Sequence, residues 1–338
     1  MKEALLWKKE KDKIRCSLCN HRCLIAEGRR GACAVRENRE GRLYSLVYGK
    51  LVAVHIDPIE KKPLYHFYPG HASFSIASVG CNFRCLFCQN ADIAQLPHDH
   101  GGLIAGKDYK AEQIVGEARE NSCLSIAYTY TEPTVWYEFT KDCGRLARKK
   151  GLKNVYVSNG YMTREMIDDA KFIDAANIDL KAFNDNFYRE ICGARLEPVL
   201  ESLKYLKKKG VWIEVTTLVI PGKNDSDDEL KQAAQFIADE LGKETPWHLS
   251  AFHPDYKMLD VPPTPLETLM RAYGIGKEAG LRYIYIGNID SETGRDTICP
   301  NCGEVVVRRG WMEVLENRLQ GRKPGQCPNC GKLVAGWF

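Results

Sequence analysis

The sequence lacks a long apolar run, an apolar leading segment and a strong excess of either charge. No apolar stretch approaches the roughly 20 residues that a membrane-spanning helix needs, and the residues after Met1 lack the apolar core of a signal peptide. The 48 basic and 44 acidic residues are spread along the chain, so the net charge of +4 indicates no particular polyanionic partner. We therefore expect a cytoplasmic protein with no membrane span.

The chain also carries no strong dinucleotide-binding fingerprint and no P-loop, although its 338 residues suffice for one large α/β domain with small additions. Strand-like and helical segments alternate from residue 71 onward, which predicts βα units around a parallel sheet. The expected strands are 72–79, 123–129, 153–158, 172–180, 211–219, 247–252 and 282–287. The expected helices are 110–121, 134–150, 163–170, 195–209, 227–241 and 265–279.

Cysteine is abundant, and its grouping is informative. Eleven of the fourteen cysteines fall into three tight clusters, while Cys123, Cys143 and Cys192 stand alone and are expected to pack as small apolar groups. In a cytosolic protein, such clusters indicate metal sites rather than disulfides.

The central cluster is Cys81-x3-Cys85-x2-Cys88, which follows a strand-like run ended by Gly80. Three thiolates from one short loop can face one metal centre and leave one metal position open to another ligand. A structural metal knuckle that lacks a ligand, or three unrelated thiols, are the alternatives.

This spacing, with Phe87 before the last cysteine and Gln89-Asn90 after it, resembles radical S-adenosylmethionine (SAM) enzymes. The similarity extends to the pyruvate formate-lyase activating enzyme group and, more narrowly, to the AmmeMemoRadiSam system branch. The resemblance implies that Cys81, Cys85 and Cys88 hold a [4Fe-4S] cluster whose fourth iron binds SAM. It also implies reductive cleavage of SAM to a 5′-deoxyadenosyl radical that abstracts a hydrogen atom.

The fold expected from the resemblance is α/β, a partial (β/α) barrel of the radical SAM type. We divide the chain into an N-terminal Cys-rich segment (1–70), the barrel (71–295) and a C-terminal four-cysteine ribbon with zinc-ribbon-like knuckles (296–338). We expect a hairpin over 42–54 and a solvated loop over 57–70, packed by Tyr65 and Phe67, although Lys61, Lys62 and His66 could face a substrate.

Polar residues follow the predicted strands, at the end where βα folds place their active sites. Thr129-Tyr130-Thr131-Glu132-Pro133 stands where the family usually has Ser-Gly-Gly-Glu-Pro, and Asp179-Leu180-Lys181 matches its Asp-Leu-Lys motif. Where relatives often have an arginine, the fifth strand has Glu214 and Thr216. By resemblance, the predicted SAM-binding residues are Asn90, Thr131, Glu132, Asn159, Asp179, Lys181 and His248. The alternative for Asp179 and Lys181 is an ordinary ion pair at the end of a strand. The alternative for His248, and for the further candidate His253, is a position in the core.

Two further clusters flank the barrel. The N-terminal set, Cys16, Cys19, Cys23 and Cys33, could hold zinc, an auxiliary iron–sulfur cluster or no metal, with His21 as a bystander. The C-terminal set, Cys299, Cys302, Cys327 and Cys330, forms two Cys-Pro-Asn-Cys-Gly knuckles that predict a tetrahedral site for zinc, or for iron as in rubredoxin. A segment this small would depend on its metal to fold, and we expect a structural or docking role.

We therefore predict a radical SAM oxidoreductase that resembles an activating enzyme, with a one-electron donor of the flavodoxin or ferredoxin type and a possible protein substrate such as a glycyl radical enzyme. The alternative from another class is a zinc-ribbon module that binds nucleic acid or protein without SAM chemistry. Its basic residues are diluted by Glu304, Glu313 and Glu316, which disfavours nucleic acid. These basic residues are Arg308, Arg309, Arg318, Arg322 and Lys323. A rubredoxin-like electron carrier would leave the barrel without a purpose.

Overall fold

The computed structural model describes residues 1–321 and 323–338, so Arg322 of the expected basic set lies outside the described residues. Its centre is an eight-stranded sheet in the order β16-β15-β14-β13-β12-β11-β9-β8. Seven neighbouring strands run parallel, and each falls within a range predicted from the sequence. They are β9 (Ala72–Ala77), β11 (Ser125–Tyr128), β12 (Lys153–Ser158), β13 (Ala175–Asp179), β14 (Trp212–Val219), β15 (Trp247–Ala251) and β16 (Ile284–Gly287).

The sheet is an open, partial barrel. Strand β8 (Ala53–Pro58) extends it by pairing antiparallel with β9, and β16 forms the other edge. The expected hairpin over 42–54 is wrong, because this stretch contributes to three sheets. Strand β6 (Arg42–Ser45) pairs with β1 (Lys2–Glu3) and β5 (Arg36–Arg39), and β7 (Lys50–Leu51) pairs with β10 (Lys107–Asp108). Alternation of apolar and polar residues indicates a strand but does not identify its partner.

The six predicted helices are present between the strands. They are α3 (Ala111–Glu120), α4 (Tyr137–Lys149), α5 (Arg164–Asp169), α7 (Glu197–Lys208), α8 (Asp227–Phe236) and α9 (Leu266–Glu278). Thr163 caps α5 and Ser226 caps α8 by accepting backbone N–H groups. A 3₁₀ turn (Pro133–Trp136) precedes α4, and a π-helical segment (Ile237–Gly242) continues α8. Single-turn helices α1 (Ala91–Ala94), α2 (Leu96–Asp99) and α6 (Asp185–Phe187) are too short to show a period in the sequence.

Most of the segment 57–70 is buried inside the barrel, so the expectation of a solvated loop is wrong, although Lys61 is exposed and lines the cavity at the strand ends. Ile59, Leu64 and Phe67 pack against small or branched residues of the strands, Ala127, Val155 and Ala175. Lys62 and His66 are fully buried as well. The small strand residues leave the space that this segment fills, and that complementarity is a tertiary property.

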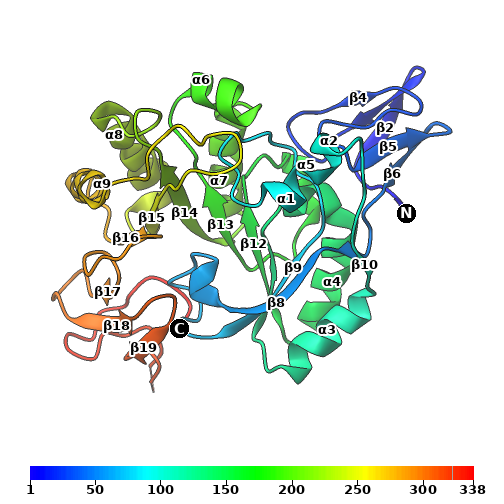
Figure 1. Cartoon of the computed structure of the whole chain (residues 1–338). Coiled ribbons are helices and arrows are strands. Elements are labelled where there is room, and N and C mark those ends of the chain that lie inside the picture. The colour runs from blue at the N-terminus through cyan, green and yellow to red at the C-terminus, as the bar shows by residue number, and fades with distance from the viewer. Residues whose placement is uncertain (322) are drawn as a thin grey trace.

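Two small lobes flank the sheet at opposite ends, as Figure 1 shows. The N-terminal lobe contains the sheets β1-β6-β5 and β2-β3-β4, with β2 (Trp7–Glu10), β3 (Lys13–Cys16) and β4 (Leu24–Ile25). The C-terminal lobe contains β17 (Thr297–Ile298), β18 (Val305–Arg309) and β19 (Val314–Asn317). Tyr283 and Tyr285 of the barrel edge share a buried cluster with Val306 and Val307. The proposed boundaries at residues 70 and 295 stay predictions.

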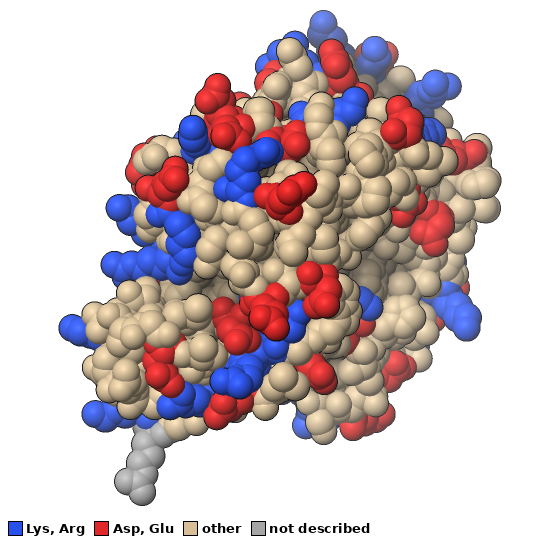
Figure 2. Space-filling view, turned by 60° about the vertical axis from the view of Figure 1, so that its left-hand side comes forward, with Lys and Arg blue, Asp and Glu red and all other residues tan. Residues whose placement is uncertain are grey.

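The charges of the C-terminal lobe do not form a basic surface. Arg309 is buried, and it donates to the Tyr65 carbonyl and to Thr297 Oγ1, both at 2.8 Å. Arg318 is paired with Glu304. On the face in Figure 2, Lys and Arg are interspersed with Asp and Glu. None of the described helices is both long and apolar enough to cross a membrane.

Candidate functional site

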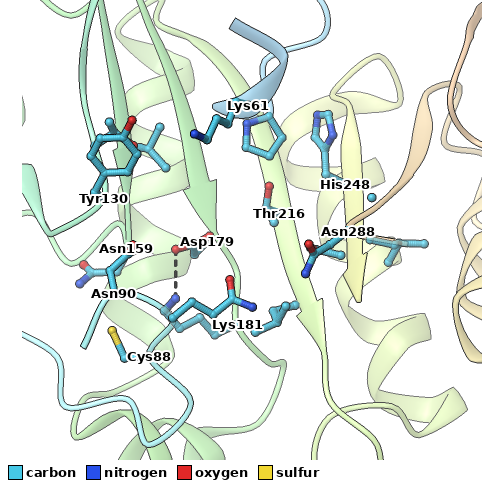
Figure 3. Close-up of a pocket in the computed structure, with 18 of the residues that line it drawn as sticks. Lys61, Cys88, Asn90, Tyr130, Asn159, Asp179, Lys181, Thr216, His248 and Asn288 are labelled. Atoms are coloured by element: carbon cyan, nitrogen blue, oxygen red, sulfur yellow. Dashed lines mark hydrogen bonds and ion pairs between the residues drawn. The ribbon is translucent and has the colours of Figure 1, made fainter. Parts of the chain in front are cut away.

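The C-terminal ends of the parallel strands surround a cavity of about 640 Å³. Every residue predicted to bind the cluster or SAM lines this cavity, and Figure 3 shows several of them facing one another. These residues are Cys81, Cys85, Cys88, Asn90, Thr131, Glu132, Asn159, Asp179, Lys181 and His248. The further candidate His253 is exposed and does not line the cavity; its Nε2 lies 3.1 Å from the Asn288 carbonyl oxygen.

The cysteine loop follows β9 and is fixed on two sides. Gly80 has a φ of 100°, and a Cβ there would lie 2.5 Å from Val35 Cγ1, so only glycine fits this turn. The N–H groups of Arg84 and Leu86 donate to the carbonyls of Cys192 and Ile191, in the π-helical turn Tyr188–Cys192. The three thiols are free, and the backbone N–H of Phe83 donates to Cys81 Sγ at 3.3 Å. Free soft donors on one fixed loop suit an iron–sulfur cluster.

The segment after β11 replaces the family's glycines with larger residues. Tyr130 has a φ of 64°, and its hydroxyl donates to the carboxylate of Asp57. The Thr131 hydroxyl donates to the Ser78 carbonyl at 2.7 Å, which ties this segment to the end of β9. A left-handed conformation at a tyrosine has an energetic cost that the Asp57 contact offsets.

Glu132 is buried, and four hydrogen bonds from the protein occupy its carboxylate. Oε1 accepts the backbone N–H and the hydroxyl of Thr134 and the hydroxyl of Ser158, while Oε2 accepts the Asn159 N–H at 2.9 Å. Burial raises the pKa of the Glu132 carboxyl, and these donors oppose that shift. The geometry indicates that Glu132 positions the Asn159 turn.

Asn159 joins the loop after β12 to the cysteine loop. Its Nδ2 donates to Asn82 Oδ1 at 2.7 Å and lies 3.8 Å from Cys81 Sγ. Its Oδ1 accepts the Tyr161 N–H at 3.1 Å, which fixes the orientation of the amide. Through these bonds, any shift of Asn159 would be transmitted to the first cysteine.

Asp179 and Lys181 point to the same side of the sheet, as the spacing predicts. Lys181 Nζ lies 3.0 Å from Asp179 Oδ2, shown as a dashed line in Figure 3. Burial lowers the pKa of the Lys181 ammonium, but Asp179 and Cys85 outweigh it and leave that pKa well above its usual value. The cavity therefore presents a fixed cation beside a carboxylate.

On the other wall, His248 Nε2 lies 2.6 Å from Glu214 Oε2, and its ring stacks on Tyr285. Burial raises the pKa of Glu214, but His248, His66 and the N–H of Tyr65 hold it below its usual value. Thr216 Oγ1 is buried and has no hydrogen-bond partner among residues 1–321 and 323–338. A buried hydroxyl without a partner in a cavity wall is a free contact for a polar ligand, so the wall suits a molecule such as SAM.

The residues at the site that sequence reasoning missed include Asn82, Asn288, Trp311 and Met312. Asn82 bonds Asn159, and Asn288, Trp311 and Met312 line the cavity. Asn288 follows a predicted strand, so the strand-end rule could have found it. No sequence signal marks Trp311 or Met312, because only the packing of the C-terminal lobe brings them to the cavity. Cys192, one of the isolated cysteines, is buried as expected but lies against Cys85.

The two flanking cysteine sets differ in geometry. The four sulfurs of Cys299, Cys302, Cys327 and Cys330 lie within 4.8 Å of one another, so this group could hold a metal ion. In the described part of the chain, no other group of three or more His, Cys, Asp or Glu ligand atoms is so compact. Cys16, Cys19, Cys23 and Cys33 do not form such a compact group, and a metal at that site stays a prediction.

Comparison with known proteins identifies the class. The family model described as "Radical SAM superfamily" matches residues 75–237, and the chain belongs to this superfamily. It is a radical SAM enzyme, and membership implies a [4Fe-4S] cluster and SAM. The uncharacterized protein MJ0808 of Methanocaldococcus jannaschii is 50% identical over 310 residues, which cover 91% of this chain and 92% of that protein.

Within the superfamily, the chain is similar to activating enzymes. The pyruvate formate-lyase 1-activating enzyme of Escherichia coli K12 is 29% identical over 224 residues, or 61% of this chain and 89% of that enzyme. A radical SAM methyltransferase from Sphaerobacter thermophilus matches in structure with a TM-score of 0.50 at 16% identity, over 66% of this chain and 68% of that one. This last match bears on the fold alone. The narrower AmmeMemoRadiSam assignment stays a prediction.

Proposed function

We propose that this enzyme resembles the activating enzymes in binding SAM beside a [4Fe-4S] cluster held by Cys81, Cys85 and Cys88, and in abstracting a hydrogen atom from a protein segment. The observation that supports this proposal is that the three free thiols and all the predicted SAM-binding residues line one cavity. When bound, the cluster supplies the electron that cleaves SAM to methionine and a 5′-deoxyadenosyl radical.

Seven residues of the cavity have a defined part in this proposal. The Lys181 ammonium binds the carboxylate of SAM, and the Asp179 carboxylate accepts hydrogen bonds from its hydroxyl groups. The Thr216 hydroxyl offers a free polar contact on the facing strand. Asn90 and Thr131 contact the methionine part, and Glu132 holds the turn that carries Asn159. Binding of SAM fills the cavity and excludes water from the reacting atoms.

The proposed protein substrate is supported by the shape and chemistry of the cavity mouth. Trp311 and Met312 of the C-terminal lobe line the cavity and are 56% and 39% exposed. Large exposed apolar side chains at the rim of a cavity suit an extended polypeptide. The similarity to an enzyme named for activating pyruvate formate-lyase points the same way. The electron donor that we propose is of the flavodoxin or ferredoxin type.

The test is product analysis under oxygen-free conditions. The protein is loaded with iron and sulfide, reduced and mixed with SAM, and 5′-deoxyadenosine and methionine are measured by chromatography. We expect both products from the wild type and from Cys123→Ala, a buried cysteine outside the cavity. We expect Cys85→Ala to lose the iron of the cluster at the Cys81 loop and, with it, both products. An iron-replete wild type without either product would overturn the proposal, and an active Cys85→Ala would overturn the ligand assignment.

A further inference from the structure

The four N-terminal cysteines meet in one buried place that the reaction above does not use. Cys16 ends β3, Cys19 and Cys23 flank the turn before β4, and Cys33 lies in the loop before β5. All four are free, and Cys16, Cys19 and Cys33 are buried while Cys23 is half-buried. The Ala32 N–H donates to Cys23 Sγ at 3.3 Å, as backbone amides do to metal-bound thiolates. A Cβ at Gly31 would lie 3.2 Å from Ile25 Cδ1, so the turn beside this sulfur is tightly packed.

A buried cation faces this set of sulfurs. Arg36 is 1% exposed and lies within coulombic range of Cys16, Cys19 and Cys33. Its Nη2 donates to Glu138 Oε1 at 2.9 Å and to the Leu5 carbonyl at 2.7 Å. Its Nε and Nη1 are buried and have no partner within the described chain. Glu138 balances the charge of Arg36, but buried guanidinium nitrogens without acceptors are costly. Thiolates bound to a metal centre would be acceptors for these two nitrogens.

The spacing of the sulfurs separates two kinds of centre. Four thiolates around one tetrahedral ion lie about 3.8 Å apart, since each bond is about 2.3 Å long. The C-terminal set meets this condition, with Cys299–Cys330 and Cys302–Cys327 sulfur distances of 3.7 Å. Among the described residues, neither the N-terminal set nor the Cys81 loop is as compact as the C-terminal set. In this respect the N-terminal set resembles the loop that is predicted to hold an iron–sulfur cluster.

The N-terminal set is also in direct contact with the Cys81 loop. A Cβ at Gly80 would lie 3.3 Å from the Cys33 carbonyl oxygen, so the two backbones touch one residue before Cys81. His21, between Cys19 and Cys23, places its Nε2 2.7 Å from the Asn82 carbonyl oxygen. Figure 1 shows the blue N-terminal strands beside α1 and α2, which follow the cysteine loop. Electrons could therefore pass between the two cysteine sets over a short path.

We propose that Cys16, Cys19, Cys23 and Cys33 hold a second iron–sulfur cluster, through which an electron enters from a reduced ferredoxin-type donor. In each transfer the donor loses one electron to this cluster, which then loses it to the cluster at Cys81, Cys85 and Cys88. The relay role rests on the proposed function, whereas the presence of the second cluster does not.

The presence of the second cluster is tested by metal and sulfide analysis with electron paramagnetic resonance. In the Cys81→Ala/Cys85→Ala/Cys88→Ala variant, we expect about two to four iron atoms with matching labile sulfide to remain, as a four-cysteine cluster requires. Adding Cys19→Ser and Cys33→Ser should remove that iron and its signal, while adding Cys123→Ser should remove neither. Circular dichroism checks that each variant is folded. A folded triple variant without labile sulfide would overturn the proposal.

The relay is tested by changing the reductant. With a small chemical reductant that reaches the Cys81 loop directly, Cys19→Ser should form 5′-deoxyadenosine within about twofold of the wild type. With reduced ferredoxin, its rate should fall at least tenfold. Equal rates with ferredoxin would overturn the relay role. Failure of the proposed function would look different, because the wild type itself would then form no product with either reductant.

Discussion

Glu132 allows a sharp test of how the SAM site is positioned. In Glu132→Gln one carboxylate oxygen becomes an NH₂ group, while two of the donors around the carboxylate are backbone N–H groups, those of Thr134 and Asn159. In either amide orientation, one of these buried N–H groups faces another donor. The change therefore removes one hydrogen bond to a charged acceptor and leaves a buried donor without a partner.

Losses of this kind cost about 1–3 kcal/mol. Because Asn159 also bonds Asn82 and lies against Cys81, we expect the loss to appear in SAM binding as well as in stability. A cost of about 1.4 kcal/mol is tenfold in affinity, so the Kd for SAM should rise by about 5-fold to about 140-fold.

The assay is titration of SAM into the iron-loaded, oxygen-free protein, followed by calorimetry, with iron content measured in the same sample. Thr134→Val is the matched control, since it removes one hydroxyl donor to Glu132 but keeps both backbone donors. We expect this control to bind SAM as the wild type does. A Glu132→Gln protein with full iron and an unchanged Kd would refute the positioning role.

Three further outcomes are expected. His66 Nδ1–H donates to the Ala335 carbonyl and the neutral ring's Nε2 accepts from the Tyr285 hydroxyl, both at 2.6 Å, and burial lowers the pKa of His66 to about 4. The neutral, buried ring contributes its full stability above pH 6.5. About 3 kcal/mol of this stability is lost as the pH falls toward 4, because the unfolded chain takes up the proton first. His66→Gln should flatten this part of the curve of denaturant midpoint against pH, and an unchanged slope would contradict the assignment. Cys302→Ala should release the metal of the C-terminal lobe and speed proteolysis of that lobe, while the iron of the barrel stays bound. Loss of the barrel iron would argue against a separate lobe. In the absence of substrate, Trp311→Ala should cleave SAM at a rate near that of the wild type. With a protein substrate, the rate of coupled cleavage should fall at least tenfold. An unaffected coupled reaction would exclude Trp311 from the docking surface.

The sequence alone determined the parallel sheet, its helices and a set of predicted SAM-binding residues, which the fold brings to one cavity. Period-3.6 and strand patterns are local, so α7 and β14 are where the pattern predicts them. In a parallel sheet the strand ends share one edge, so Asn159, Asp179 and Lys181 had to converge. Cys81, Cys85 and Cys88 lie in a single loop, so their spacing in the sequence is enough to predict a shared metal centre.

Only the tertiary structure decided what depends on contacts between distant segments. The burial of Ile59, Leu64 and Phe67 inside the barrel depends on the small side chains of Ala127 in β11 and Ala175 in β13, which no local pattern connects to residues 57–70. Trp311 reaches the cavity because the C-terminal lobe packs on Tyr283 and Tyr285. The spacing of the four N-terminal cysteines in the sequence left zinc, an iron–sulfur cluster and no metal open. Only the fold brings Arg36 close to them and sets the distances between their sulfurs, because ligand distances do not follow from the order of residues.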